Sequence, residues 1–75
     1  MPNTQSFGQR AVGLSFNPSG DDAVGQCKAA YAGIIDNLNE LRLNATDVEV
    51  KRLASVAITE AQTAQMWAVK AITWK

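Results

Sequence analysis

The segment 16–20, Phe-Asn-Pro-Ser-Gly, contains the residues best suited to hold a ligand. A helix is expected to begin at its end, and the free backbone N–H groups and the macrodipole at a helix N-terminus favour an anion. The ring of Phe16 can stack on a nucleobase, Asn17 can hydrogen-bond to a base edge, and Lys28, two turns into the helix, can reach a phosphate. The same residues also fit a simpler role, in which Phe16 plugs the end of the helices and Ser19 only caps.

Residues that can carry out catalysis are scarce. The chain has no histidine, so no serine has the partner that would activate it. Cys27 is the single cysteine and falls within an expected apolar stripe, where a buried and inert thiol is more typical than a nucleophile. Asp36 and Glu40 are better explained by a solvated helix face than by paired acid–base work. We therefore predict no catalytic residue, no metal site and no cofactor.

One long helix is expected between Ser19 and about Leu43. Apolar residues recur there every three or four positions, as they do on one face of a helix. Ser19 is followed three positions later by an acidic residue and is expected to be the N-cap. Gly25 and Gly33 each cost roughly 1 kcal/mol relative to alanine in a helix interior. They indicate either the close approach of another backbone or a ligand, or simply a weakened helix.

A second long helix is expected from Asp47 to about Thr73, opened by a capping box at Thr46. The connection is so short that the two helices must be antiparallel neighbours. We predict an all-α fold, in which an irregular N-terminal arm over residues 1–18 precedes a single helical-hairpin domain over residues 19–75.

The apolar surface exceeds what a two-helix hairpin can cover. The first helix offers one apolar stripe: Val24, Cys27, Tyr31, Ile34, Leu38 and Leu41. The second offers one made mostly of alanine: Leu53, Ala57, Ala61, Ala64, Ala68 and Ala71. Trp67 and Trp74 fall outside that stripe, and a helix that is apolar most of the way round must be buried on more than one side. We therefore predict a homo-oligomer; the alternative is a monomer in which both tryptophans fold back on the arm.

Composition narrows the range of partners. The chain has 75 residues, 47% of them apolar, and seven basic residues balance seven acidic ones. A formal net charge of zero gives no electrostatic attraction to a DNA or RNA duplex or to an anionic membrane. No apolar run approaches the roughly 18 to 20 residues that span a bilayer. These properties favour a small module that assembles or binds, with no membrane and no duplex nucleic acid as partner.

Three motifs occur together in a fixed order. They are F-N-P-S-G at 16–20, K-R-L-A-x-x-A-I-T-E at 51–60 and A-x-M-W-A-V-K-A at 64–71. This combination resembles the helical hairpin of phage cyclic-nucleotide sponges, a family that includes the anti-CBASS sponge and the hairpin domain of the Thoeris anti-defence sponge. The resemblance covers about residues 12–73, nearly the whole chain.

The resemblance implies an all-helical hexamer that binds messengers without chemical change. Pockets between neighbouring protomers of such sponges hold cyclic dinucleotides, for example cyclic GMP–AMP, or cyclic ADP-ribose signals. Some members hold cyclic trinucleotides at a separate site near the three-fold axis. The implied role is to sequester the messenger in the cytoplasm of an infected bacterial host, so that CBASS-type effectors stay inactive.

The resemblance also implies roles for particular residues. Phe16 resembles the stacking aromatic and Lys28 resembles the lysine that meets the phosphates. The adjacent wall would be formed by Asn17, Pro18 and Ser19.

Two residues of the second helix are candidates for the trinucleotide site. Arg52 and Thr59 are seven positions apart and therefore lie on one helix face.

The chain departs from the family in two respects. Some members have tyrosine where Phe16 stands, so a phenolic hydrogen bond would be missing here. The extra sheet of the Thoeris members is not expected in this chain, which disfavours cyclic ADP-ribose as the preferred ligand.

Two other classes of function stay open. The first is an oligomeric helical hairpin that serves as a structural or regulatory protein-interaction module, in which Lys28 and Lys70 would only be solvated or paired charges. The second is an enzyme that degrades the messenger. Calorimetry with a panel of cyclic nucleotides separates binding from protein interaction, and recovery of unchanged ligand excludes degradation.

Overall fold

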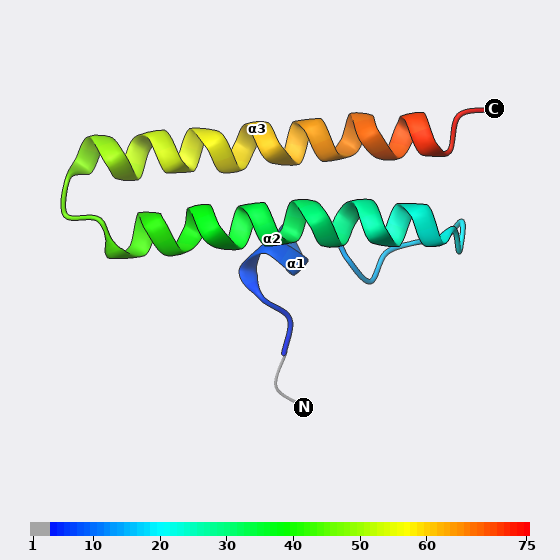
Figure 1. Ribbon diagram of the computed structural model, residues 1–75, viewed down its shortest axis with the longest axis horizontal. Helices are drawn as coiled ribbons and strands as arrows, with labels where there is room; N and C mark the ends of the chain where they lie inside the picture. The colour runs from blue at the N-terminus through cyan, green and yellow to red at the C-terminus, as the bar shows by residue number, and fades with distance from the viewer. Residues whose placement is uncertain (1–3) are drawn as a thin grey trace.

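The structure is a computed structural model that describes residues 4–75, and the regular elements of that range are all helices. They are α1 (Phe7–Ala11), α2 (Asp22–Asn44) and α3 (Val48–Ile72). The two long helices lie side by side and run antiparallel, joined by the short turn at 45–47 (Figure 1). The predicted all-α hairpin is confirmed; of the predicted arm, residues 1–3 lie outside the described residues.

The long helices begin slightly later than predicted, because aspartates cap them. The N-cap of α2 is Asp21, not Ser19, and its carboxylate accepts a hydrogen bond of 2.8 Å from the backbone N–H of Ala23. The N-cap of α3 is Asp47, not Thr46, and it accepts at 2.8 Å from the backbone N–H of the second helical residue. A carboxylate accepts more strongly than a hydroxyl and also complements the positive end of the helix macrodipole. At the start of each long helix, the aspartate is therefore the N-cap in place of the hydroxyl residue that precedes it.

The arm is not irregular throughout, since its first part forms the five-residue helix α1. Ser6 begins that helix with a capping box: its hydroxyl accepts from the backbone N–H of Gln9, and the Gln9 side chain accepts from the Ser6 backbone. So short a helix is marginal in isolation and depends on what it packs against.

Helix α1 is docked on α2 through a glycine. The backbone N–H of Gly8 donates to Asp36 Oδ1 at 2.7 Å. A Cβ atom at Gly8 would lie 2.1 Å from the carbonyl oxygen of Ala32, so only glycine allows this approach. The half-buried Asp36 is therefore an anchor for the arm, and its assignment to a solvated face was wrong.

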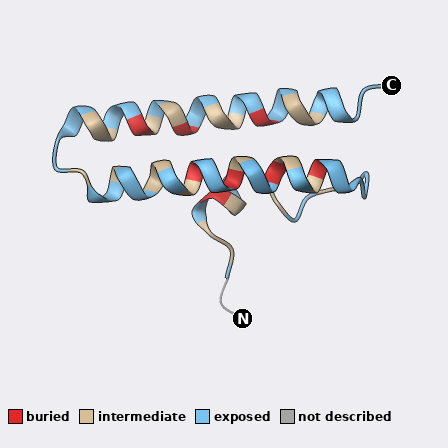
Figure 2. Ribbon diagram, in the orientation of Figure 1, coloured by how far each residue is buried: buried red, intermediate tan, exposed pale blue. Residues whose placement is uncertain are grey.

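The core lies where the arm, α2 and α3 meet. Its buried cluster consists of Val12, Ala32, Ile35 and Ile58. Figure 2 shows the buried residues between the start and the middle of α2 and on the side of α3 that faces it. Ile35 is the most deeply buried, with no exposed surface.

The predicted apolar stripes are only partly correct. On α2 the buried residues are Val24, Lys28, Ala32 and Ile35, whereas Ile34 is 50% exposed. On α3 the buried residues are Ala54, Ile58 and Gln65, whereas Leu53 is 53% exposed. Each buried face is turned by about one residue from the predicted stripe. The reason is that each contains a polar residue, Lys28 or Gln65, which an apolar pattern does not include.

Gly25 and Gly33, the two glycines inside α2, do not mark a close approach within one chain. A Cβ atom at Gly33 would meet nothing within 4 Å, and at Gly25 it would meet only Asn17 Nδ2 at 3.9 Å. Within the described residues these glycines only weaken α2.

A large apolar surface remains on the second half of α3. Met66, Trp67 and Trp74 are 62%, 67% and 74% exposed. Neither tryptophan is folded back on the arm, as the monomeric alternative required. In a single chain this surface is uncovered.

Candidate ligand-binding site

A cavity of about 320 Å³ lies between the second half of the arm and the adjoining ends of α2 and α3. All five predicted dinucleotide-site residues line it: Phe16, Asn17, Pro18, Ser19 and Lys28. Its volume falls within the range of roughly 300–1,000 Å³ that is typical of small-molecule pockets. The fold thus brings these residues together around one space.

Three further lining residues were missed by sequence reasoning: Val24, Val69 and Thr73. Two of them belong to the last turns of α3 or its C-cap. The signal was present, because antiparallel pairing places the end of the second helix beside the start of the first. These side chains add an apolar wall opposite the arm.

Lys28 is the central charged group of the cavity, and it is 6% exposed. Its Nζ donates to the carbonyl oxygen of Gly13 at 3.1 Å and to the carbonyl oxygen of Phe16. An ammonium group has three N–H donors, so one remains for a ligand. Among residues 4–75 no carboxylate pairs with this ammonium, because the one ion pair there joins Arg52 and Glu49. Since a buried charge ordinarily requires a counter-charge, an anion suits this position.

Phe16 is strongly exposed, at 71%, although it contacts the buried lysine. The Lys28 Nζ lies 5.5 Å from the centroid of its ring, within the range of a cation–π interaction. That contact occupies one side of the ring. The exposed remainder is available for stacking.

The wall beside the ring is fixed by a local hydrogen-bond network. The Ser19 hydroxyl donates to Asn17 Oδ1 at 2.8 Å and accepts from the backbone N–H of Asp21 at 3.2 Å. Asn17 Nδ2 donates to the Asp21 carbonyl at 3.0 Å. Asn17 therefore keeps one N–H for a base edge, and its position is set before any ligand arrives.

The expected anion site at the start of α2 is weaker than the sequence suggested. The carboxylate of Asp21 already accepts from the Ala23 N–H, and Asp22 adds a second negative charge in the first turn. These charges repel an anion from the helix terminus. Attraction for a phosphate must come from Lys28 instead.

A second cavity, of about 490 Å³, adjoins the first and shares Phe16, Lys28 and Val69 with it. Arg10 of the arm and Gln65 of α3 also line it. Sequence reasoning assigned no role to either residue. The ring of Phe16 and the ammonium of Lys28 thus stand at the boundary between two spaces.

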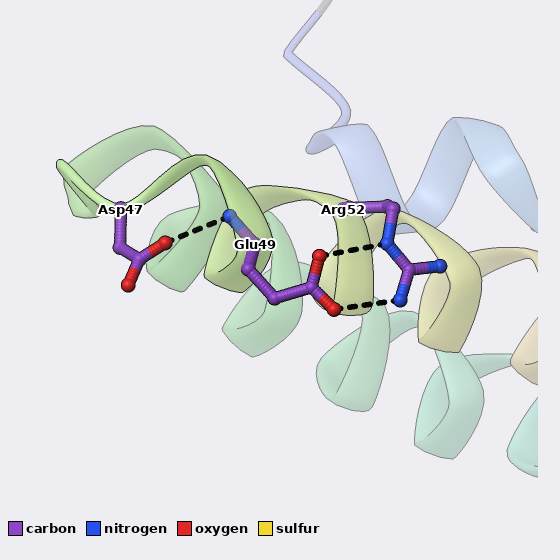
Figure 3. A network of polar contacts seen from close by, with 3 residues as sticks. All are labelled: Asp47, Glu49 and Arg52. Carbon is purple, nitrogen blue, oxygen red and sulfur yellow. Dashed lines mark hydrogen bonds and ion pairs between the residues drawn. The ribbon is translucent and has the colours of Figure 1, made fainter.

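The two candidates for the trinucleotide site lie elsewhere on α3 and line neither cavity. Arg52 donates to both carboxylate oxygens of Glu49, at 2.9 and 2.7 Å, and Asp47 caps the same turn (Figure 3). The hydrogen bonds between Arg52 and Glu49 hold the pKa of Glu49 below its ordinary value of 4.5 and raise the pKa of Arg52. The exposed Thr59 donates to the carbonyl of Ser55 at 3.3 Å.

Residues 4–75 contain no group of three or more His, Cys, Asp or Glu side chains that could hold a metal ion. No helix of the described chain has the length and apolarity needed to cross a membrane.

The chain matches a known protein family. The family model described as Acb2/Tad1, hairpin domain, matches residues 9–73. The matched range includes α2 and α3 and every residue of the candidate site. No curated protein and no solved structure matches the chain.

Proposed function

Because the chain belongs to the Acb2/Tad1 hairpin-domain family, a family of cyclic-nucleotide sponges, we propose that it sequesters cyclic dinucleotides such as cyclic GMP–AMP. It binds the messenger and later releases it unchanged, and so keeps CBASS-type effectors inactive. The protein is of phage origin, and its site of action is the cytoplasm of an infected bacterial host.

The observation that carries the proposal is a buried lysine without a carboxylate partner beside an exposed aromatic ring. Lys28 is 6% exposed and Phe16 is 71% exposed, and both line the same cavity. A cyclic dinucleotide supplies what each lacks, since it carries two phosphates and two bases. The phosphate would accept from the third N–H of Lys28, and a base would stack on the exposed side of the ring.

The working assembly is a homohexamer whose pockets are completed by neighbouring protomers. The exposed apolar end of α3, with Met66, Trp67 and Trp74, supports self-association because a patch of this kind is rarely left in water. Light scattering that gave a stable species of 8.1 kDa would contradict both the assembly and the shared pocket.

A second site, for cyclic trinucleotides, is proposed at Arg52 and Thr59. Arg52 offers a planar guanidinium that is exposed and held in position by Glu49. A phosphate would have to share or displace that carboxylate. Cyclic ADP-ribose variants are the third class of ligand to test, at the first site.

Calorimetry with a panel of cyclic di- and trinucleotides tests the proposal. We expect heat of binding with at least one cyclic dinucleotide, and recovery of the same compound by chromatography after heat denaturation. A linear product would indicate an enzyme instead. No heat with any compound at tens of micromolar would favour the protein-interaction module, for which the exposed tryptophans would then be the docking surface.

A further inference from the structure

Gln65 of α3 is a buried polar residue that the site described so far does not use. Its side chain is 5% exposed, yet no hydrogen bond of the described residues engages its amide. No buried side-chain nitrogen or oxygen is left both sealed from solvent and without a partner, so both amide atoms reach the small exposed part of this residue. That part lines the second cavity.

An amide with so little exposed surface has lost most of its water without gaining a hydrogen bond within this chain, which is unfavourable. The neighbouring Gln62 shows the usual solution, since its Nε2 donates to the carbonyl of Ala11 at 3.3 Å. Gln65 lies three positions further along the same helix and has no such acceptor. Its donor and acceptor are therefore directed to something outside this chain's own polar groups.

The shape of the surroundings restricts what that partner can be. The second cavity, of about 490 Å³, shares the Phe16 ring, the Lys28 ammonium and Val69 with the first. A ligand with two bases and a phosphate between them can thus extend from one cavity into the other past Lys28. Met66 adds an apolar contact for a flat group, and Arg10 contributes a guanidinium.

We propose that the second cavity takes one base of the cyclic dinucleotide and that Gln65 reads it as adenine. The proposal rests on the function proposed above. A glutamine amide pairs with adenine through two hydrogen bonds, donating to N7 and accepting from the N6 amino group. Guanine offers two acceptors, O6 and N7, on the same edge and satisfies only the donor of the amide.

The test is calorimetry of Gln65→Met with cyclic di-AMP, cyclic GMP–AMP and cyclic di-GMP. Methionine keeps the length of the side chain and removes both hydrogen-bonding groups. We expect the affinity for the two adenine-containing ligands to fall about ten- to a hundredfold, and the affinity for cyclic di-GMP to fall by a smaller factor, because guanine loses only one hydrogen bond. The melting temperature should stay the same or rise, because the variant no longer holds a largely desolvated amide that lacks a partner within the chain.

Gln62→Met is the matched control. It removes an amide from the same helix, but that amide belongs to a residue that lines neither cavity. Its effect on affinity should be the same for all three ligands.

The outcomes distinguish a failure of the adenine contact at Gln65 from a failure of the proposed function. If the parent binds these ligands and Gln65→Met lowers the affinity for all three equally or for none, the reading of adenine by Gln65 is wrong while the proposed function stands. If the parent binds none of them, the proposed function fails and the inference fails with it.

Discussion

Replacing Lys28 by methionine is the most informative single change, because this lysine both holds the arm and faces the cavity. Methionine preserves the buried stem of the side chain and removes the ammonium. Two charge-assisted hydrogen bonds, to the carbonyls of Gly13 and Phe16, are then lost. Each is worth about 1.5–3 kcal/mol when it is made.

The net loss of stability is smaller than the sum of the two bonds. Phe16 is exposed and Gly13 is half-buried, so water can reach their freed carbonyls. The variant also no longer buries a charge that has no counter-ion. We therefore expect a loss of about 2 kcal/mol, which corresponds to a fall in melting temperature of about 8–16 °C for a domain of this size.

Loss of the phosphate contact should weaken binding of cyclic dinucleotide about ten- to a hundredfold. The slope of log affinity against log salt concentration should also become shallower by about one phosphate contact. Circular-dichroism melts and calorimetry at several salt concentrations measure the two effects, at one fixed protein concentration because assembly makes the melting temperature concentration-dependent.

Lys51→Met is the control. The half-buried Lys51 also donates to a backbone carbonyl, that of Arg42 at 3.0 Å, but it lines neither cavity. Lys51→Met should lower the melting temperature less than Lys28→Met does, and it should leave the affinity for cyclic dinucleotide unchanged. An unaltered affinity and salt slope in Lys28→Met would refute the role of the ammonium in ligand binding, and an unaltered melting temperature would refute its role in holding the arm.

Three further predictions follow from the geometry of the arm and of α3. Phe16→Ala should weaken cyclic dinucleotide binding about ten- to a hundredfold through the loss of base stacking, with the assembly unchanged by light scattering; full retention of affinity would count against the ring. Gly8→Ala places a methyl group 2.1 Å from a carbonyl oxygen of α2 and should cost about 1–3 kcal/mol, seen as faster amide exchange in the arm; parent-like protection would contradict this packing. Arg52→Gln should raise the pKa of Glu49 towards 4.5, measured by NMR titration. In the parent, the contribution of the depressed pKa is complete above pH 4.5 and is lost as the pH falls through the lowered value, so an unshifted titration in the variant would rule out this ion pair in solution.

The long helices were predictable because their signals are local. The three-four spacing of apolar residues and the acidic residues at each helix start are read directly from the sequence, and both helices lie close to the expected bounds. The N-cap of α2 was predicted wrongly as Ser19, because serine and aspartate are both N-cap residues and only the backbone conformation shows that Asp21 is the cap.

The arm and the buried faces were not predictable in the same way. Helix α1 depends on a glycine that meets the backbone of α2 and on Asp36, which is 28 positions away in the sequence. Burial of Lys28 depends on carbonyls 15 and 12 positions before it. Such contacts between distant segments leave no periodic pattern, and they turned the buried face of α2 away from the apolar stripe.

The candidate site was predictable only in part. A contiguous motif supplies Phe16, Asn17 and Ser19, so the sequence alone pointed to the first wall of the cavity. The opposite wall comes from the end of α3 and required the pairing of the two helices. Gln65 could not be singled out, because a glutamine on a helix is ordinarily a solvated residue.

The way in which the arm is held has a consequence for its equilibrium between docked and undocked forms. The arm packs against the core through Val12, Ala11 and Leu14, and its other ties to the helices include single polar contacts at Gly8, Ala11 and the Gly13–Phe16 turn. A segment with so few buried apolar contacts opens at a lower free energy than the whole domain. Only the docked form presents the Phe16 ring beside Lys28, so the apparent dissociation constant equals the intrinsic one divided by the docked fraction. If half of the molecules had an undocked arm, the apparent constant would be about twofold higher, and any change that secures the arm would tighten binding without adding a contact to the ligand.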